Sequence, residues 1–89
     1  MKKIVVRKGL VMENIGESIT IFDGENSVLH TLNNTGAFIF KQLIRGKNKG
    51  RIIEAITKKY QIRKAVAEKD FDEFAGGLRK KGIIEITDS

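Results

Sequence analysis

The chain has 89 residues, no cysteine and a net charge of +6. A chain of this length has room for one hydrophobic core, so we expect a single domain over residues 1–89 without a deep substrate cleft. The lack of cysteine excludes disulfides, thiolate nucleophiles and zinc–thiolate sites. No apolar run approaches the roughly 20 residues that cross a bilayer, so we expect a cytoplasmic protein without a membrane segment.

The first third of the chain predicts three short strands. Ser18-Ile19-Thr20-Ile21 alternates polar and β-branched residues, as a half-buried strand does. Turn signals at 14–17 and 23–26 separate this strand from one near residues 10–13 and another over 27–32. Three strands joined by two tight turns indicate an antiparallel meander. Residues 1–8 are either an extra edge strand or a loose arm.

After Leu32 the period of the apolar residues changes from two to about 3.6. Asn33, Asn34 and Thr35 are suited to begin a helix, because short polar side chains can accept hydrogen bonds from its free N–H groups. Apolar spacings of three and four predict this helix, a second around 52–60 and a third over 66–81. Gly82 suits the position just beyond the third helix, and 83–86 suits a final strand. The order of elements predicts an α+β domain of winged-helix-like architecture.

The charge of the chain is concentrated in its middle. Residues 11–40 contain no Lys or Arg, whereas residues 41–64 contain nine of them against Glu54 alone. Such a basic block favours an acidic or polyanionic partner, and a small basic winged helix is a candidate for DNA binding. However, the first half of the third helix, which would enter the major groove, carries four carboxylates, and these oppose phosphate. Nucleic-acid binding therefore stays only as an alternative.

No set of residues has catalytic or metal-binding spacing. His30 is the only histidine, and the acidic residues over 68–73 lack the order of a calcium loop. We therefore predict no catalytic residue, no metal site and no cofactor. The pair Gly76-Gly77 is unusual, because two glycines inside a helix cost about 2 kcal/mol relative to alanine. They either permit close approach of another backbone or soften the helix.

The segment 28–39, Val-Leu-His-Thr-Leu-Asn-Asn-Thr-Gly-Ala-Phe-Ile, resembles the strand-to-helix signature of the PqqD family. In that signature a Leu-Asn pair precedes a small residue and then an apolar one. The likeness continues through Arg45-Gly46 and the apolar residues of the second and third helices to Lys81-Gly82-Ile83-Ile84, and it covers about residues 9–86. The chain differs from the family at Lys49-Gly50, where Ser or Thr usually opens the second helix, and at Gly76-Gly77, where larger helix formers are common.

The resemblance implies a non-catalytic peptide chaperone, also called a RiPP recognition element. Such a domain binds the leader of a ribosomally made precursor peptide and presents it to a modifying enzyme, often a radical SAM enzyme, in PQQ or other peptide pathways. An alternative is an interaction domain that assembles with an enzyme and contacts no peptide.

The family mechanism implies that the leader adds a strand to the edge of the meander, beside the third helix. The free backbone groups of the third strand would pair with the leader, and apolar residues of the helix would receive its side chains. The peptide-binding residues that follow from the resemblance come from these two elements: Val28, Leu29, His30, Thr31, Asp70, Phe71, Phe74, Leu78 and Lys81.

Overall fold

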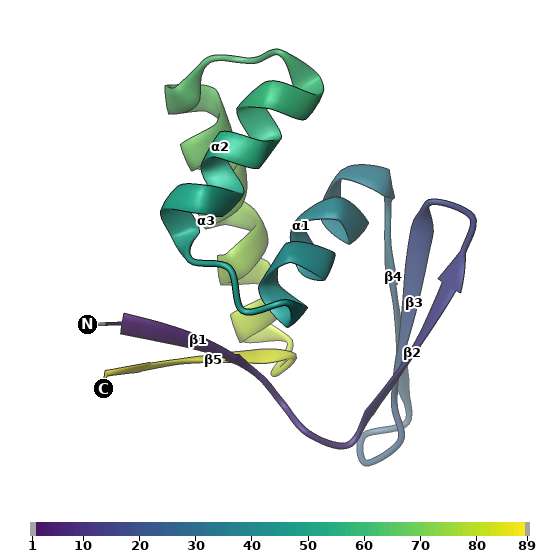
Figure 1. Ribbon diagram of the computed structural model, residues 1–89. Helices are drawn as coiled ribbons and strands as arrows, with labels where there is room; N and C mark the ends of the chain where they lie inside the picture. The colour runs from purple at the N-terminus through teal and green to yellow at the C-terminus, as the bar shows by residue number, and fades with distance from the viewer. Residues whose placement is uncertain (1, 89) are drawn as a thin grey trace.

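Four strands, three helices and a terminal strand follow one another in the computed structural model, which describes residues 2–88. The elements are β1 (Lys2–Val6), β2 (Leu10–Ile15), β3 (Ser18–Asp23), β4 (Val28–Leu32), α1 (Asn34–Ile44), α2 (Lys49–Tyr60), α3 (Lys64–Lys80) and β5 (Ile84–Asp88) (Figure 1). The α+β, winged-helix-like prediction is confirmed, including the three helices and the terminal strand.

The strands form two separate antiparallel sheets. One is the predicted meander, in the order β2-β3-β4, and the other pairs β1 with β5. Ile4 lies opposite Ile86 in this small sheet, so the N-terminal segment is an edge strand rather than a loose arm. The two ends of the described chain therefore lie side by side (Figure 1).

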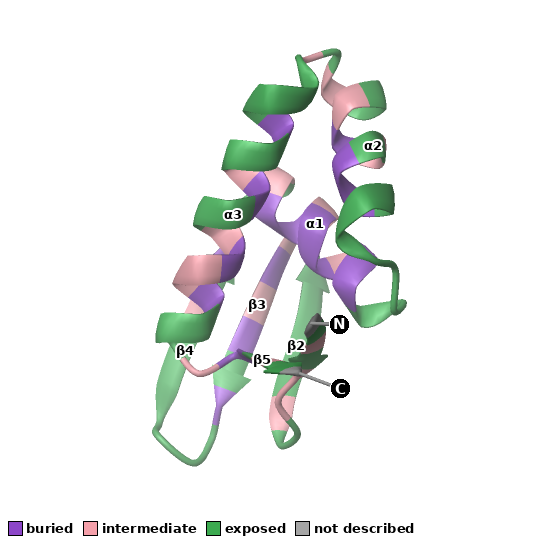
Figure 2. Cartoon of the chain, turned by 90° about the vertical axis from the view of Figure 1, so that its left-hand side faces the viewer, coloured by how far each residue is buried: buried purple, intermediate pink, exposed green. Residues whose placement is uncertain are grey.

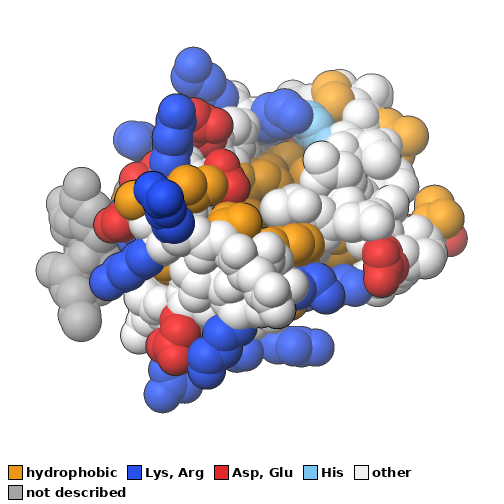
Figure 3. All heavy atoms as spheres, turned by 90° about the horizontal axis from the view of Figure 1, so that it is seen from above, with side chains coloured by type: hydrophobic (Ala, Val, Ile, Leu, Met, Phe, Trp, Pro, Cys, Tyr) orange, Lys and Arg blue, Asp and Glu red, His pale blue; other side chains and the backbone are white. Residues whose placement is uncertain are grey.

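The two faces of the meander differ in burial. Ile19 and Ile21 of β3 point inward and are buried. On the outer face, Phe22 pairs with Val11 of β2 and Leu29 of β4, and these three side chains are 45%, 64% and 63% exposed. Successive side chains of a strand point to opposite faces of the sheet, so these three point outward while Ile19 and Ile21 point inward. Viewed from above, hydrophobic side chains are exposed on the side of the molecule where the sheet lies (Figure 3).

Short polar residues begin two of the helices. The Asn33 side chain accepts a hydrogen bond from the Gly36 N–H at 2.9 Å, and the Asn48 side chain accepts one from the Arg51 N–H at 2.9 Å. Asn33 confirms the predicted start of α1. Asn48, the residue before Lys49, caps α2. This helix is therefore capped although it lacks the Ser or Thr that usually opens it. Gly82, with φ of +74°, follows the C-cap residue Lys81 just beyond α3, as predicted.

One hydrophobic cluster holds the helices against both sheets. Helix α1 lies between the meander and the α2–α3 pair, and its Ile39 and Phe40 are almost wholly buried. Ile52 and Ile56 contribute from α2, and Ile84 contributes from β5. Figure 2 shows the buried stripes of α1, α2 and α3 facing one another. Because all three helices share this core, the position of α3 relative to the meander is set by packing.

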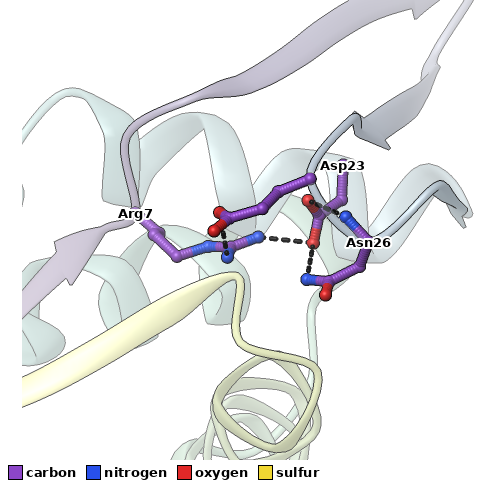
Figure 4. A network of polar contacts seen from close by, with 4 residues as sticks. Arg7, Asp23 and Asn26 are labelled. Atoms are coloured by element: carbon purple, nitrogen blue, oxygen red, sulfur yellow. Dashed lines mark hydrogen bonds and ion pairs between the residues drawn. The ribbon is translucent and has the colours of Figure 1, made fainter.

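A polar network ties the segment after β1 to the end of β3. Asp23 is buried, and one of its carboxylate oxygens accepts hydrogen bonds from the Arg7 guanidinium and, at 2.8 Å, from the Asn26 side chain (Figure 4). These contacts lower the pKa of Asp23 from 3.8 to about 2, mainly through Asn26 and then Arg7, and they outweigh the opposite effect of burial. The carboxylate therefore stays charged in moderately acidic solution.

Asp23→Asn should remove a pH-dependent part of the stability. Because folding lowers the pKa of Asp23, its charge stabilises the fold fully above pH 3.8, and this stabilisation is lost as the pH falls through about 2. The difference in urea midpoint between wild type and variant should therefore be largest at pH 5–7 and shrink between pH 4 and pH 2. Glu25→Gln is the control, because exposed Glu25 lies 3.6 Å from Arg7. A wild-type advantage that stays constant from pH 7 to pH 2 would contradict this assignment.

Candidate functional site

Strand β4 forms one edge of the meander. It pairs with β3 from Val28, opposite Asp23, to Leu32, opposite Ile19. No strand within residues 2–88 pairs with its other side. Its outward N–H and C=O groups are therefore free to pair with an added strand. The opposite edge, β2, is also open, so side-chain surroundings must distinguish the two.

A groove of about 270 Å³ runs between the end of β4 and the C-terminal half of α3. One wall comes from the junction of β4 and α1, and the other comes from the C-terminal half of α3. The lining residues are Thr31, Leu32, Asn33, Gly36, Glu73, Phe74, Gly77, Leu78 and Lys81. This groove makes β4 the more suitable edge for recognition, because side chains of an added strand would find a second surface there.

The junction between β4 and α1 is shaped by its local sequence. Leu32 ends the strand, Asn33 caps the helix, and no loop intervenes. A Cβ atom on buried Gly36 would lie 2.9 Å from a ring carbon of Phe74, closer than side chains normally approach. The small residue after the Leu-Asn pair therefore leaves space for the aromatic ring that lines the groove.

The wall formed by α3 is one flank of that helix. With about 100° between successive residues, Phe74 and Lys81 point in nearly the same direction, and Glu73 and Gly77 lie farther around the same side. A Cβ atom on Gly77 would meet nothing within 4 Å, so this glycine widens the groove. Glu73 and Lys81 are about 12 Å apart along the helix axis, which gives the groove opposite charges toward its two ends.

The predicted site residues fall into different places. Thr31, Phe74, Leu78 and Lys81 line the groove. Val28, Leu29 and His30 lie farther along the same edge strand, and Leu29 projects from the outer face beside Phe22. Asp70 is half-buried on the groove flank of α3, one turn before Phe74. These residues share one edge of the molecule, although their side chains do not share one surface.

Phe71 needs a correction, because the structure places its ring in the core and not in this groove. Only 2% of it is exposed, and the exposed part opens on the opposite flank of α3. The spacing of three and four marks the buried stripe of a helix, and Phe71 lies on that stripe with Ala67 and Ala75. Lining residues absent from the prediction were Leu32, Asn33, Gly36, Glu73 and Gly77, of which the last two share the helical side of Phe74.

Within residues 2–88 no group of three His, Asp or Glu residues could hold a metal ion. None of the described helices is both long and apolar enough to cross a membrane.

Solved structures of other proteins have the same fold as this chain. No match was found among curated proteins. The solved structure of TbiB1 in complex with the TbiA(β) leader peptide is 22% identical, with a TM-score of 0.86 over 90% of this chain and 93% of that one. Lasso peptide synthetase B1 complexed with the leader peptide is 20% identical, with a TM-score of 0.87 over 93% of this chain and 98% of that one. At these identities the likeness shows a shared fold.

The sequence itself matches one protein family over most of its length. Residues 19–84 match the family described as Coenzyme PQQ synthesis protein D (PqqD). The matched region begins in β3 and ends at the start of β5, so it includes the strand-to-helix junction, all three helices and both walls of the groove. The chain therefore belongs to the PqqD family.

Proposed function

We propose that this protein is a non-catalytic peptide chaperone that binds the leader of a ribosomally synthesised precursor peptide by strand addition to β4. It presents the bound precursor to a modifying enzyme, such as a radical SAM enzyme, in the synthesis of PQQ or of another peptide natural product. The observation that carries this proposal is the open edge of β4 beside the groove of α3.

The geometry suits an extended peptide better than a compact ligand. A peptide paired with β4 directs alternate side chains to opposite faces. One set enters the groove, where half-buried Phe74 supplies apolar surface above the buried Leu78, and the other set lies beside Leu29 on the outer face. Backbone pairing along Val28–Leu32 supplies affinity, and the groove supplies selectivity.

Charges of the groove walls add a preference for peptide direction. Glu73 favours a basic side chain near one end, and Lys81 favours an acidic side chain or carboxylate near the other. Asp70 extends the acidic end by one helical turn. Phe71 contributes from the core, by holding α3 at its distance from β4.

The comparisons support the same role. Both solved relatives are described as complexes with a leader peptide, and the family is described by its part in PQQ synthesis. Precursor peptides are made by ribosomes, so we place the protein in the cytoplasm, where the leader is first available. The role needs no cofactor and no catalytic residue in this chain.

Titration of ¹⁵N-labelled protein with the precursor peptide of its own biosynthetic pathway tests the proposal. We expect amide shifts along Val28–Leu32 and along residues 73–81, together with new protection of β4 amides from hydrogen exchange. The same precursor without its leader is the control and should cause no shift. Shifts confined to residues 41–64 would refute strand addition, and no shift with an intact precursor would favour an enzyme-assembly domain that contacts no peptide.

A further inference from the structure

A second and larger groove lies on the opposite flank of α3. It encloses about 500 Å³ between α3, the β1–β5 sheet and the loop that joins α1 to α2. Its floor is apolar and comes from four elements: Ile4, Leu43, Phe71, Ala75 and Ile86. Apolar surface collected in a concave site is suited to receive an apolar side chain of a partner.

The rim of this second groove is strongly basic. Lys3, Lys47, Lys49 and Arg79 line it, and among the described lining residues Asp72 is the one carboxylate. Asp72 is already paired with Lys49 at 2.9 Å, and this contact raises the pKa of Lys49. The rim therefore retains an excess of positive charge after its internal ion pair is counted.

The two adjacent glycines of α3 open on different grooves. Gly77 lines the groove beside β4, whereas Gly76 lines the second groove, and a Cβ atom on either would meet nothing within 4 Å. Neighbouring residues point about 100° apart around a helix, so the body of α3 separates the two sites. A peptide held against β4 therefore leaves the second groove uncovered.

We propose that the second groove docks the modifying enzyme, through an acidic segment of the enzyme that carries an apolar anchor side chain. This inference rests on the proposed function, which requires the domain to hold precursor and enzyme together. The basic rim complements acidic residues of the segment, and the floor around Phe71 receives the anchor. The position across α3 from β4 permits both partners to bind at once.

Other occupants fit these features less well. A nucleic acid would use the basic rim but leave the apolar floor without a partner. A second copy of this chain carries a net charge of +6 and is repelled by the basic rim. An acidic protein segment with an apolar anchor uses both parts of the groove.

Two matched pairs of variants test the docking site. Gly76→Leu fills the second groove, and Gly77→Leu fills the groove beside β4; both changes favour the helix and meet no neighbouring atom at Cβ. Arg79→Glu reverses a charge on the rim, and Lys80→Glu makes the same change at an adjacent exposed position that lines neither groove. Binding to the modifying enzyme of the same biosynthetic pathway, and separately to the precursor, is measured by calorimetry. Circular dichroism verifies folding.

Gly76→Leu and Arg79→Glu should each weaken enzyme binding at least tenfold and change precursor binding by less than threefold. Lys80→Glu should bind both partners like wild type. Wild-type enzyme affinity should also fall when salt is raised from 50 to 300 mM. The inference is overturned if wild type does not bind the enzyme, if Gly76→Leu and Arg79→Glu bind it normally, or if Lys80→Glu weakens binding as much as Arg79→Glu. Failure of wild type to bind the precursor would instead overturn the proposed function.

Discussion

Gly77→Leu is expected to reduce affinity for the precursor leader at least a hundredfold. The groove beside β4 is only about 270 Å³, and a leucine side chain at this position would occupy the space beside Phe74 that the proposed peptide needs. A hundredfold loss corresponds to about 2.7 kcal/mol of binding free energy. Fluorescence anisotropy with a labelled leader peptide measures the dissociation constant directly.

Gly76→Leu is the control for Gly77→Leu, because it makes the same chemical change one residue away and on the other flank of α3. Its leader affinity should stay within threefold of wild type. Both variants should be slightly more stable than wild type, since glycine is an unfavourable helix residue. Equal leader affinity for Gly77→Leu and wild type would show that the leader does not use this groove.

Phe40→Ala is expected to lower the free energy of unfolding by about 3–5 kcal/mol. Phe40 is fully buried in α1, between the meander and the other two helices, so the shortened side chain leaves a cavity at the centre of the core. The total free energy of unfolding of a native protein is only about 5–15 kcal/mol, so a large part of the stability would be lost. Urea unfolding followed by circular dichroism measures the change.

Phe38→Ala provides the comparison for Phe40→Ala within the same helix. Phe38 is half-buried and packs edge-to-face against Tyr60, with ring centres 6.0 Å apart. Removing the Phe38 ring removes peripheral contacts and leaves no enclosed cavity. The free energy of unfolding should therefore fall by about 1–2 kcal/mol. A larger loss for Phe38→Ala than for Phe40→Ala would place the centre of the core elsewhere.

Local chemistry made much of the fold predictable. The change of apolar period after Leu32 and the capping residue Asn33 located the start of α1, and Gly82 located the end of α3. The start of α3 was less accurate, since the helix begins at Lys64 and not at residue 66. Its N-cap residue, Arg63, makes no side-chain capping bond, so the usual sequence signal is missing.

The candidate site was only partly predictable, because periodicity identifies which side of a helix is buried but not what lies beside it. The pattern of Phe71, Phe74 and Leu78 marked one apolar face, whereas the structure divides it between the core and two grooves. The sequence marked Gly76 and Gly77 as unusual and suggested either close approach of another backbone or a softer helix. Neither explanation described what surrounds them. The structure shows that each opens on a different groove.

The sequence by itself determined the order of the strands and helices, the meander and the junction at 28–36, since these depend on neighbouring residues and short-range hydrogen bonds. Its likeness to the PqqD family was most evident at this junction and continued through the helices to Ile84. Only the tertiary structure decided that β1 pairs with β5, that Gly36 makes room for Phe74, and that α3 separates two grooves. These features depend on contacts between residues far apart in the chain, and packing around the shared core sets those contacts.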